Sequence, residues 1–584
     1  MFLATTDDKR FWKKDEKILF LGEWCKKFDQ KHKWERLDYE VLPYHWNDRG
    51  RFNSDWQFVN KVHDRLVIEL SEKIKEVHSV EYSPMYWNIL TGIWLKFFIG
   101  ILLDRYLSIR SAIDSGREIH TWLPNFHSQS FHPLGYYDHY NLSAETSYNL
   151  HIYGRIIELL GEIPFEVKDD LVNSQSQPTY GADGAFKSIG RKLLGLYGQM
   201  VPDRWNKAVF VKSYIPTSDL IKLQLALGQV PYPFAPEVCA ADYPVDHDLR
   251  KSLVFNEGES EFESLLAKII PDQIPRVYLE GYSDMCRRSL EAFPGDPKVI
   301  ISSGAFEFDE GFKFWAAHQV DRDVKLVGVQ HGGGDGTSNV CSSEDHELNI
   351  CDRYFSWGWS TESGSQAKPM PSNIVFRNIG QVEPTPDGRI LILGMSIPPY
   401  FSYFYSGILG PQVPDYIATI HQFMRLLRPE IYELLTLRLY PRELGWEEKQ
   451  RWPKLEPFLQ ISQGDKPIRE ELSKSRLCVC TYNGTNLLEN LAANFPTLAF
   501  WDPEVWELRK SAVPAFEKLV QAGILHYSPE SAAKKLTEIY SDPLAWWDSP
   551  EVQKAKDQFC HQFARTSETW LQDWKNEVSS LSGD

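Results

Sequence analysis

The sequence predicts an α/β protein built from two doubly wound domains that face each other across a cleft. Continuous apolar runs of strand length, such as KVIISSGA (298–305) and VKLVGV (324–329), alternate with longer segments of helical periodicity. Strands that are apolar on both faces are typical of parallel sheets covered by helices. A chain of 584 residues is too long for one ordinary core, and a polar stretch at 360–388 divides the strands into two groups.

The first group of strands precedes the polar stretch. These strands are predicted at Phe2–Thr6, Lys17–Glu23, Tyr39–Tyr44, His120–Pro124, Ala208–Ile215, Lys298–Ala305 and Val324–Val329. Helices are predicted at about 56–80, 84–112 and 149–163, the last with apolar residues at i, i+3, i+4 and i+7. We therefore expect a first domain over 1–375 with helical insertions.

The second group of strands follows the polar stretch. These strands are predicted at Arg389–Met395, Leu434–Pro441, Arg476–Gly484 and Pro496–Asp502, with helices at about 413–427, 485–494 and 529–541. They define a second domain over 376–550. A charged, polar helix at about 551–577 closes the chain, and we expect the segment 551–584 to pack back on the first domain.

Composition excludes several classes of protein. The net charge of −17 argues against nucleic-acid binding, because phosphate recognition needs a basic surface. The eight cysteines are scattered without a CxxC pair, which predicts neither a zinc site nor a disulfide framework. Together with an N-terminus that has no apolar signal core, this favours a reducing cytoplasm.

The longest apolar stretch is NILTGIWLKFFIGILL (88–103). It is short for a membrane span and carries Lys96 in its middle. We expect a buried core helix here, and the alternative is a face that docks on a membrane.

The segment GVQHGGGDG (328–336) leaves a predicted strand through a histidine and a run of glycines. Ligands of open α/β sheets bind at the carboxyl ends of strands, and glycines let a ligand approach the main chain. His331 is a candidate general base or phosphate ligand, with Gln330, Gly332 and Gly333 beside it. The alternative is a histidine that caps a tight loop. Asp335 is either catalytic or a residue that shapes the turn.

Carboxylates follow the preceding strand. Glu307 and Asp309 come directly after the strand that ends at Ala305, where a carboxylate is a candidate base or nucleophile. The alternative is that Asp309 caps the next helix.

Two strand ends of the second group carry candidate ligand groups. The turn TYNGTNLLE leads into a helix, so Asn483, Gly484, Thr485 and Asn486 can present free amides and hydroxyls to a phosphate. Plain capping of the helix is the alternative reading. The remaining candidate binding residues are Glu489 one turn further on, Tyr440 and Arg442 after the strand that ends at Leu439, and Thr6 and Glu23 at N-terminal strand ends.

The order of these motifs resembles a known family. A strand-end QHG, a linker, a strand-end Tyr-Pro and TYNGTNLLENLAANFPTLAFW resemble the GT-B glycosyltransferases of bacterial surface polysaccharides, the O-antigen and capsule. The segments FLATT, FLGEWC and YHWNDR extend the resemblance over nearly the whole chain, to a group that includes pseudaminic-acid transferases. Similarity to the capsule Kdo transferases is limited to the QHG and NGTNLLE regions.

The resemblance implies a GT-B fold of two Rossmann-like domains, the first on the acceptor side and the second binding a nucleotide sugar. It implies transfer of a CMP-activated nonulosonic acid, pseudaminic-acid-like, to a cell-surface polysaccharide or lipid-linked glycan, with retention. Asn483, Gly484 and Thr485 would then hold the CMP phosphate, and His331 would face the sugar or that phosphate. No cofactor is implied beyond the donor substrate.

One position departs from the related enzymes, which usually carry a His-Pro pair against the nucleotide phosphate. Here the matching pair is Tyr440-Pro441. A tyrosine hydroxyl donates one hydrogen bond but supplies no positive charge near neutral pH, and Arg442 is the residue that compensates. We expect no metal, because the one DxD triplet, Asp321–Asp323, precedes a strand instead of following one.

Three other functions stay open from the sequence. They are a CMP-Kdo transferase, a polyol-phosphate transferase of the CDP-glycerol type, and a non-catalytic protein that binds a nucleotide or glycan. We expect a cytoplasmic protein that binds no nucleic acid, with peripheral association at the inner face of the cytoplasmic membrane left open.

Overall fold

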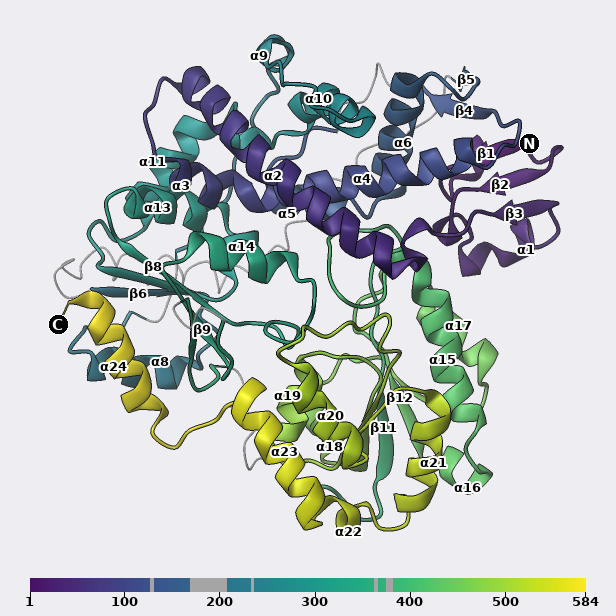
Figure 1. Cartoon of the computed structure of the whole chain (residues 1–584), viewed down its shortest axis with the longest axis vertical. Coiled ribbons are helices and arrows are strands. Elements are labelled where there is room, and N and C mark those ends of the chain that lie inside the picture. The colour runs from purple at the N-terminus through teal and green to yellow at the C-terminus, as the bar shows by residue number, and fades with distance from the viewer. Residues whose placement is uncertain (126–130, 169–206, 233–235, 362–365, 374–381, 584) are drawn as a thin grey trace.

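The computed structural model describes residues 1–125, 131–168, 207–232, 236–361, 366–373 and 382–583. Within this part of the chain, parallel sheets occupy three regions (Figure 1). We name them the N-terminal unit (described residues of 1–168), the middle domain (207–373) and the C-terminal domain (382–550). The predicted boundary between residues 375 and 376 lies outside the described residues.

Each region has its own strands. The N-terminal unit contains β1 (Phe2–Ala4), β2 (Ile18–Phe20), β3 (Tyr39–Val41), β4 (Thr121–Pro124) and β5 (Phe165–Lys168). The middle domain contains β6 (Ala208–Val211), β7 (Val299–Ser302), β8 (Lys325–Val329), β9 (Arg353–Ser356) and β10 (Ala367–Pro369). The C-terminal domain contains β11 (Arg389–Leu393), β12 (Leu435–Arg438), β13 (Gln460–Ser462), β14 (Ser475–Cys480), β15 (Thr497–Phe500) and β16 (Leu525–His526).

Helices connect and cover these strands. In the first two regions they are α1 (Lys31–Trp34), α2 (Arg49–His78), α3 (Pro84–Trp87), α4 (Ile93–Asp114), α5 (Tyr136–Leu142), α6 (Thr146–Leu160), α8 (Thr217–Ala226), α9 (His247–Ser252), α10 (Glu261–Gln273), α11 (Tyr282–Ala292), α12 (Ala305–Phe308), α13 (Glu310–Val320) and α14 (Ser342–Ile350). Further on they are α15 (Val413–Arg425), α16 (Pro429–Tyr432), α17 (Glu448–Leu455), α18 (Ile468–Leu472), α19 (Thr485–Ala492), α20 (Val513–Gln521), α21 (Pro529–Ile539), α22 (Pro543–Trp547), α23 (Pro550–Phe563) and α24 (Trp570–Ser582).

The two large sheets differ in topology. The middle sheet has the order β10-β9-β8-β7-β6, with its strands in chain order, whereas the C-terminal sheet has the order β13-β12-β11-β14-β15-β16. The second order reverses direction between β11 and β14, which is the Rossmann arrangement and marks a crevice for ligands at the carboxyl ends of those strands. Since helices cover both faces of each sheet, the predicted α/β class with two doubly wound domains is confirmed.

Alternating side chains of β11 show how the sequence builds two cores on one sheet. Ile390 and Ile392 join the cluster beneath α15 and α21, while Leu391 and Leu393 join the cluster beneath α19, α20 and α23. Successive side chains of a strand point to opposite faces, so a strand that is apolar throughout must be covered on both.

The N-terminal strands form a separate sheet and do not join the middle domain. β1, β2 and β3 pair in parallel, and β4 pairs with β5. The bridge between Phe2 and His120 links these two small sheets. The strands predicted for the first domain are therefore present, but they divide between the N-terminal unit and the middle domain.

The long apolar stretch forms part of a buried helical segment. The helix over Pro84–Asp114 is long and apolar enough to cross a membrane, and 94% of its most apolar window is buried inside the protein. A π-helical turn, η5 (Asn88–Gly92), interrupts it, and the buried amine of Lys96 pairs with Asp345. The prediction of a buried core helix is confirmed.

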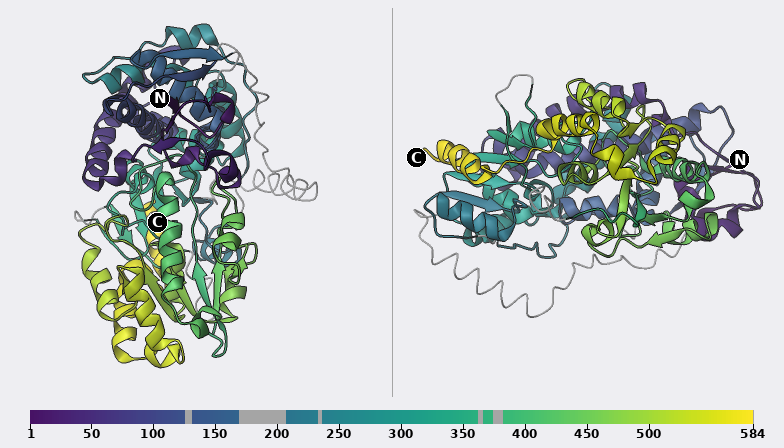
Figure 2. Two further views of the ribbon diagram at one scale, coloured as in Figure 1. Left: turned by 90° about the vertical axis from the view of Figure 1, so that its right-hand side faces the viewer. Right: turned by 90° about the horizontal axis from the view of Figure 1, so that it is seen from below.

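The C-terminal segment differs from the single helix predicted over 551–577. It forms two helices, because the chain breaks between α23 and α24 at residues 564–569. α23 packs on α19 and α20 of the C-terminal domain, whereas α24 crosses to the middle domain and packs on α8 and β7 (Figures 1 and 2). The helix α24 therefore connects the C-terminal domain to the middle domain.

The segment between β11 and α15 also connects two regions, the C-terminal domain and the N-terminal unit. Phe401 and Phe404 of this segment pack on Trp46 of the N-terminal unit, with ring centroids 4.6 and 4.8 Å apart. The buried guanidinium of Arg105 donates to the carbonyl of Phe401 at 3.0 Å. The C-terminal domain thus inserts aromatic side chains into the core of the N-terminal unit.

Candidate functional site

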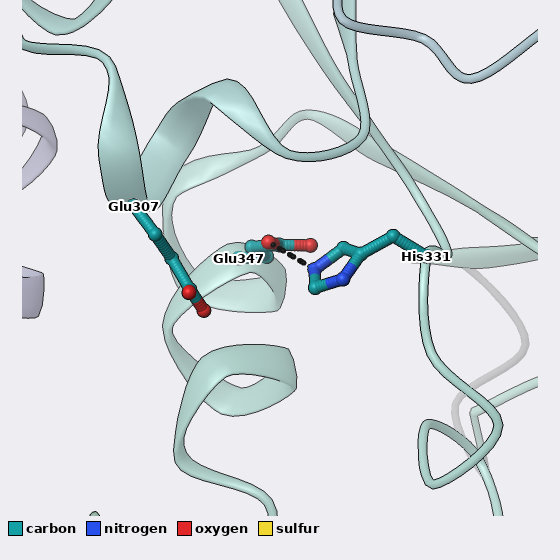
Figure 3. Close-up of side chains that lie close together, drawn as sticks. All are labelled: Glu307, His331 and Glu347. Atoms are coloured by element: carbon teal, nitrogen blue, oxygen red, sulfur yellow. Dashed lines mark hydrogen bonds and ion pairs between the residues drawn. The ribbon is translucent and has the colours of Figure 1, made fainter. Parts of the chain in front are cut away.

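Three titratable side chains converge at the carboxyl ends of β7 and β8. Glu307 lies on α12 directly after β7, His331 follows β8, and Glu347 comes from α14 (Figure 3). His331 Nε2 lies 2.9 Å from Glu347 Oε1. One ligand atom from each of the three residues lies within 4.8 Å of the others. We name these residues the His331 cluster.

The carboxylates control the charge of His331. Burial works against protonation of the imidazole, but the negative charges of Glu347, Asp335 and Glu307 outweigh it and raise the pKa of His331 well above its usual value. The carboxylates around it therefore favour the imidazolium form of His331.

Burial raises the pKa of the neighbouring carboxyls in turn. The pKa of Glu347 rises to about 8 because its carboxyl is buried, although the charge of His331 works in the opposite direction. Burial also raises the pKa of Glu307. Glu347 Oε2 is buried and has no hydrogen-bond partner among the described residues. An acid and a base with shifted pKa values at a strand end are typical of a functional site.

The side chain of Gln330 holds the loop that carries His331. Its Oε1 accepts from the backbone N–H of Trp357 at 2.7 Å and from Trp359 Nε1 at 2.8 Å. Its Nε2 donates to the carbonyls of Gly332 and Asp335. Gln330 is fully buried. The structure therefore gives this predicted binding residue a structural role, because its polar atoms are occupied within the protein.

Asp335 belongs to a second buried cluster. Its carboxylate accepts from the backbone N–H of Gly332 at 3.3 Å, from Tyr354 Oη at 3.2 Å and from Cys341 Sγ at 3.5 Å. Glu344 accepts from the N–H of Gly336 at 2.7 Å. The sequence left two roles open for Asp335, and the geometry favours the one in which it shapes the turn. The charge of Asp335 also contributes to the raised pKa of His331.

The glycines bring the loop against the C-terminal domain. The N–H of Gly333 donates to Thr485 Oγ1 at 3.0 Å, and a Cβ on Gly333 would overlap the backbone N of Thr485. A Cβ on Gly334 would overlap the hydroxyl of Tyr405. Glycine is required at position 333 because two backbones approach closely there, and at position 334 because a tyrosine packs on the loop.

The predicted phosphate turn lies at the same contact. Asn483 Nδ2 donates to Thr337 Oγ1 at 3.1 Å, and its Oδ1 is buried without a partner among the described residues. Gly484 precedes α19 in extended backbone and makes no side-chain cap. Asn486 donates to Tyr482 Oη at 2.7 Å. The structure thus brings the turn and the glycine loop together, across the seam between two domains.

Asp309 caps a helix. Its Oδ1 accepts from the backbone N–H of Phe312 at 2.9 Å, and its Oδ2 pairs with Lys212 Nζ at 2.9 Å. The alternative reading of Asp309 as an N-cap of α13 is therefore the one that its geometry supports. Glu307 is the carboxylate of this pair that reaches His331.

The residues that follow β12 lie on the same side of the molecule as the His331 cluster. Burial raises the pKa of Tyr140 to about 12, with added contributions from the charge of Glu307 and from Tyr440, and Arg442 works against them. Tyr140 is therefore within electrostatic reach of Glu307 on one side and of Tyr440 and Arg442 on the other. Tyr440 and Arg442 are exposed.

The three remaining predicted residues are Thr6, Glu23 and Glu489. Thr6 is buried, and its Oγ1 accepts from the N–H of Asp8 at 3.4 Å. Glu23 pairs with Lys26 at 3.0 Å and lines a pocket between the N-terminal unit and the C-terminal domain. Glu489 is half-buried on α19.

Sequence reasoning missed Glu347, the residue that pairs with His331. A signal was available, because Glu344 and Glu347 are three apart in the helix that follows the glycine loop, and i,i+3 residues share a helix face. Glu344 reaches across the domain seam to Arg509 at 2.7 Å, and burial raises its pKa to about 7. The helix α14 therefore contributes Glu347 to the His331 cluster and Glu344 to the seam between the domains.

Several solved structures share a loose likeness with this chain. MurG of Acinetobacter baumannii matches with 10% identity, a TM-score of 0.32, and coverage of 64% of this chain and 99% of its own. The spinosyn rhamnosyltransferase SpnG, complexed with spinosyn aglycone, matches with 12% identity, a TM-score of 0.30 and coverage of 64% and 99%. The wall teichoic acid polymerase TagF matches with 10% identity, a TM-score of 0.28 and coverage of 68% and 96%.

Likenesses at these scores carry no weight for function, and the fold assignment rests on the sheet topology of the chain itself. No curated protein matches the chain. A family match is far more extensive, because the LIC12162 family transferase matches residues 1–578. These residues include all three regions of sheet and every residue of the His331 cluster. The chain belongs to the LIC12162 family of transferases.

Proposed function

We propose that this transferase is a GT-B glycosyltransferase that moves a CMP-activated nonulosonic acid, pseudaminic-acid-like, to a cell-surface polysaccharide with retention. The observation that carries the proposal is the His331 cluster, which lies at the carboxyl ends of β7 and β8 beside the contact between Gly333 and Thr485. It places an imidazolium and a carboxylate next to the N-terminus of a helix, where a nucleotide phosphate is favoured.

His331 stabilises the leaving phosphate in this mechanism. When the bond from the anomeric carbon to the phosphate oxygen breaks, negative charge grows on that oxygen. The carboxylates around His331 raise its pKa and keep its second proton in place, so the imidazolium supplies positive charge and a hydrogen bond to the leaving group. The backbone N–H groups at Gly484, Thr485 and Asn486 supply further donors, and Arg442 adds a cation.

Glu307 is the carboxylate that acts at the sugar. With retention, a Glu307 oxygen attacks the anomeric carbon as the phosphate leaves. The acceptor hydroxyl then displaces the carboxylate and gives its proton to an oxygen of the departed phosphate. Asp309 is less suited to this role, since its two oxygens already cap α13 and pair with Lys212. The half-buried Tyr140 and Tyr403, both within electrostatic reach of Glu307, give the sugar an aromatic wall.

No metal and no cofactor take part in the proposed reaction, because the imidazolium and the helix amides neutralise the leaving group. The acceptor is a glycan or lipid-linked glycan. We place the enzyme in the cytoplasm, where CMP-sugars are made and thiols stay reduced, with peripheral attachment to the inner face of the membrane.

The test is release of CMP by the purified full-length protein. CMP-linked nonulosonic acids are compared with CMP-Kdo, CDP-glycerol, and UDP- and GDP-sugars, each with and without a chelator. We expect turnover with a CMP-nonulosonic acid, no loss in the chelator, and a fall of about 100-fold or more in the His331→Ala variant.

His561→Ala is the matched control, because His561 is exposed on α23. Turnover of CDP-glycerol alone would favour the polyol-phosphate transferase, and nucleotide binding without turnover would favour a binding protein. Full activity of His331→Ala would contradict the assignment of the His331 cluster. Loss of activity in the chelator would mean that the clustered carboxylates hold a metal ion.

A further inference from the structure

A pocket of about 200 Å³ opens between the N-terminal unit and the C-terminal domain. Its lining comprises Glu23, Lys26, Phe28, Lys31 and Trp34 on one side and Pro414, Trp446 and Arg451 on the other. Pockets for drug-sized ligands measure roughly 300–1,000 Å³, so this one suits a single sugar ring better than a whole nucleotide sugar.

The two walls of the pocket are joined to each other. The backbone N–H of Phe28, in the turn η3 (Phe28–Gln30), donates to Glu447 Oε2 at 2.9 Å. Gln412 Nε2 donates to Asn47 Oδ1 at 3.0 Å. α1 and α17 lie at the right of Figure 1, whereas β8 and α14, which carry the His331 cluster, lie to the left. The pocket is therefore a preformed site apart from that cluster.

The lining has an excess of positive charge. Lys26 pairs with Glu23 at 3.0 Å, but Lys31 and Arg451 make no ion pair with any described residue. Arg451 Nε is buried without a hydrogen-bond partner among those residues. Burial lowers the pKa of Arg451 although several glutamates lie nearby, as expected for a cation that lacks a direct counterion.

Aromatic rings supply an apolar wall beside these cations. The guanidinium of Arg451 lies 4.8 Å from the ring centroid of Phe28. Trp446 is fixed by a hydrogen bond from its Nε1 to the carbonyl of Ile397 at 3.1 Å, and Trp34 by one to the carbonyl of Lys27 at 2.8 Å. A rigid indole offers a flat apolar face and loses little conformational entropy when a ring stacks on it.

The segment 9–36, which supplies one wall of the pocket, is rich in cations. Residues 9–36 contain ten Lys and Arg against five Asp and Glu, whereas the whole chain carries −17. Within this segment, the side chain of Lys33 lies beside Lys9 and lowers its pKa. Three of these cations pair with carboxylates just outside the segment, because Arg10 contacts Asp8, Lys17 contacts Glu40 and Lys27 contacts Asp7.

We propose that this pocket binds an acidic sugar residue of the glycan acceptor, with its carboxylate on Arg451 and Lys31 and its ring against the tryptophans. The proposal rests on the proposed function, since it names the acceptor as an anionic glycan. The pocket then holds a sugar distant from the one that receives the transferred group.

Isothermal titration of the full-length protein tests the proposal. The probes are a glucuronic-acid-containing oligosaccharide, a neutral oligosaccharide of the same length, inorganic phosphate, and vesicles of anionic phospholipid. We expect the acidic oligosaccharide to bind, and Arg451→Gln to weaken it about tenfold, because a charge-assisted hydrogen bond is lost. Lys31→Gln changes an exposed residue and should weaken binding in the same direction.

Lys449→Gln is the matched control, since Lys449 is exposed on the same helix as Arg451 but does not line the pocket. Equal binding of the acidic and neutral probes, or equal binding by the wild type and both pocket variants, would overturn the proposal. Binding of phosphate or vesicles alone would also overturn it. CMP release without an acceptor should be unchanged in Arg451→Gln, so failure here is distinct from failure of the proposed function.

Discussion

His331 differs from an exposed histidine because carboxylates face it from three segments of chain. Glu347 lies on α14, Asp335 lies in the glycine loop and Glu307 lies on α12, and all three raise the pKa of His331. The folded-state pKa of His331 is above its usual value, so the imidazolium is present at low pH. It is lost as the pH rises through the folded-state value.

Replacing Glu347 with glutamine tests this balance. The Glu347→Gln variant loses the strongest contribution that raises the pKa of His331, so the imidazolium will give up its proton at lower pH. We expect the basic limb of the pH profile of kcat/KM for CMP release to move to lower pH.

The control is Asp345→Asn, which removes a charge from a nearby position on α14, where Asp345 pairs with Lys96 instead. A basic limb that stays in place in Glu347→Gln would show that His331 is not the group whose proton loss ends activity.

The roles of two residues only two positions apart can differ in a way that the sequence does not reveal. Glu307 and Asp309 follow the same strand and carry the same charge, so sequence reasoning treated both as candidate bases or nucleophiles. The break between α12 and α13 makes Asp309 the N-cap and leaves Glu307 facing His331. Capping geometry, and not residue type, separates the two.

At the scale of elements, α24 is an essential cover for the middle sheet. Trp574 is 1% exposed, its ring centroid lies 5.3 Å from that of Phe355 on β9, and its Nε1 donates to the carbonyl of Pro371 at 3.1 Å. Because Trp574 fills the layer between α24 and the sheet, its truncation leaves a large cavity and an unpaired carbonyl.

We expect Trp574→Ala to destabilise the middle domain by about 3–5 kcal/mol, the usual cost of a buried Trp→Ala change. Urea unfolding followed by circular dichroism should show the first transition at a lower urea concentration. Gln572→Ala, at an exposed position of the same helix, should leave that transition within experimental error. Equal unfolding curves for the two variants would mean that α24 does not stabilise the domain.

At the scale of the whole molecule, the seam between the domains passes beside the His331 cluster. Arg509 of the C-terminal domain donates from its backbone N–H to the carbonyl of Thr337 at 2.9 Å and pairs through its side chain with Glu344. Gly333 meets Thr485 at the same seam. The relative position of the domains therefore sets the distance between His331 and the turn at Asn483–Thr485.

Two adjacent glycines offer a matched test of the seam. A methyl group at position 333 would overlap the Thr485 backbone, whereas one at position 332 would lie 3.7 Å from Asp335 in ordinary contact. We expect Gly333→Ala to lower kcat/KM for CMP release by about 100-fold, since a shift of about 1 Å in a reacting group has that effect. Gly332→Ala should change it little. Equal activity of the two variants would show that the seam does not position the site.

Local sequence patterns were enough to predict most of the strands and two members of the His331 cluster, His331 and Glu307. Apolar runs predicted the strands β6–β8, β11, β12, β14 and β15, and helical periodicity predicted α4, α6 and α15, because both patterns reflect local burial on one or two faces. The strands β5, β9, β10, β13 and β16 lie outside the apolar runs from which strands were predicted. His331 and Glu307 were predicted because each follows a predicted strand closely in sequence.

Long-range contacts set how these elements combine. Glu347 reaches His331 from 16 residues away, and Thr485 reaches Gly333 from 152 residues away. The N-terminal strands form a sheet of their own, and the pocket at Arg451 needs two segments that are hundreds of residues apart. The physical reason is that local patterns record which face of an element is buried. They do not record what covers it, and that choice depends on packing and charge across the whole chain.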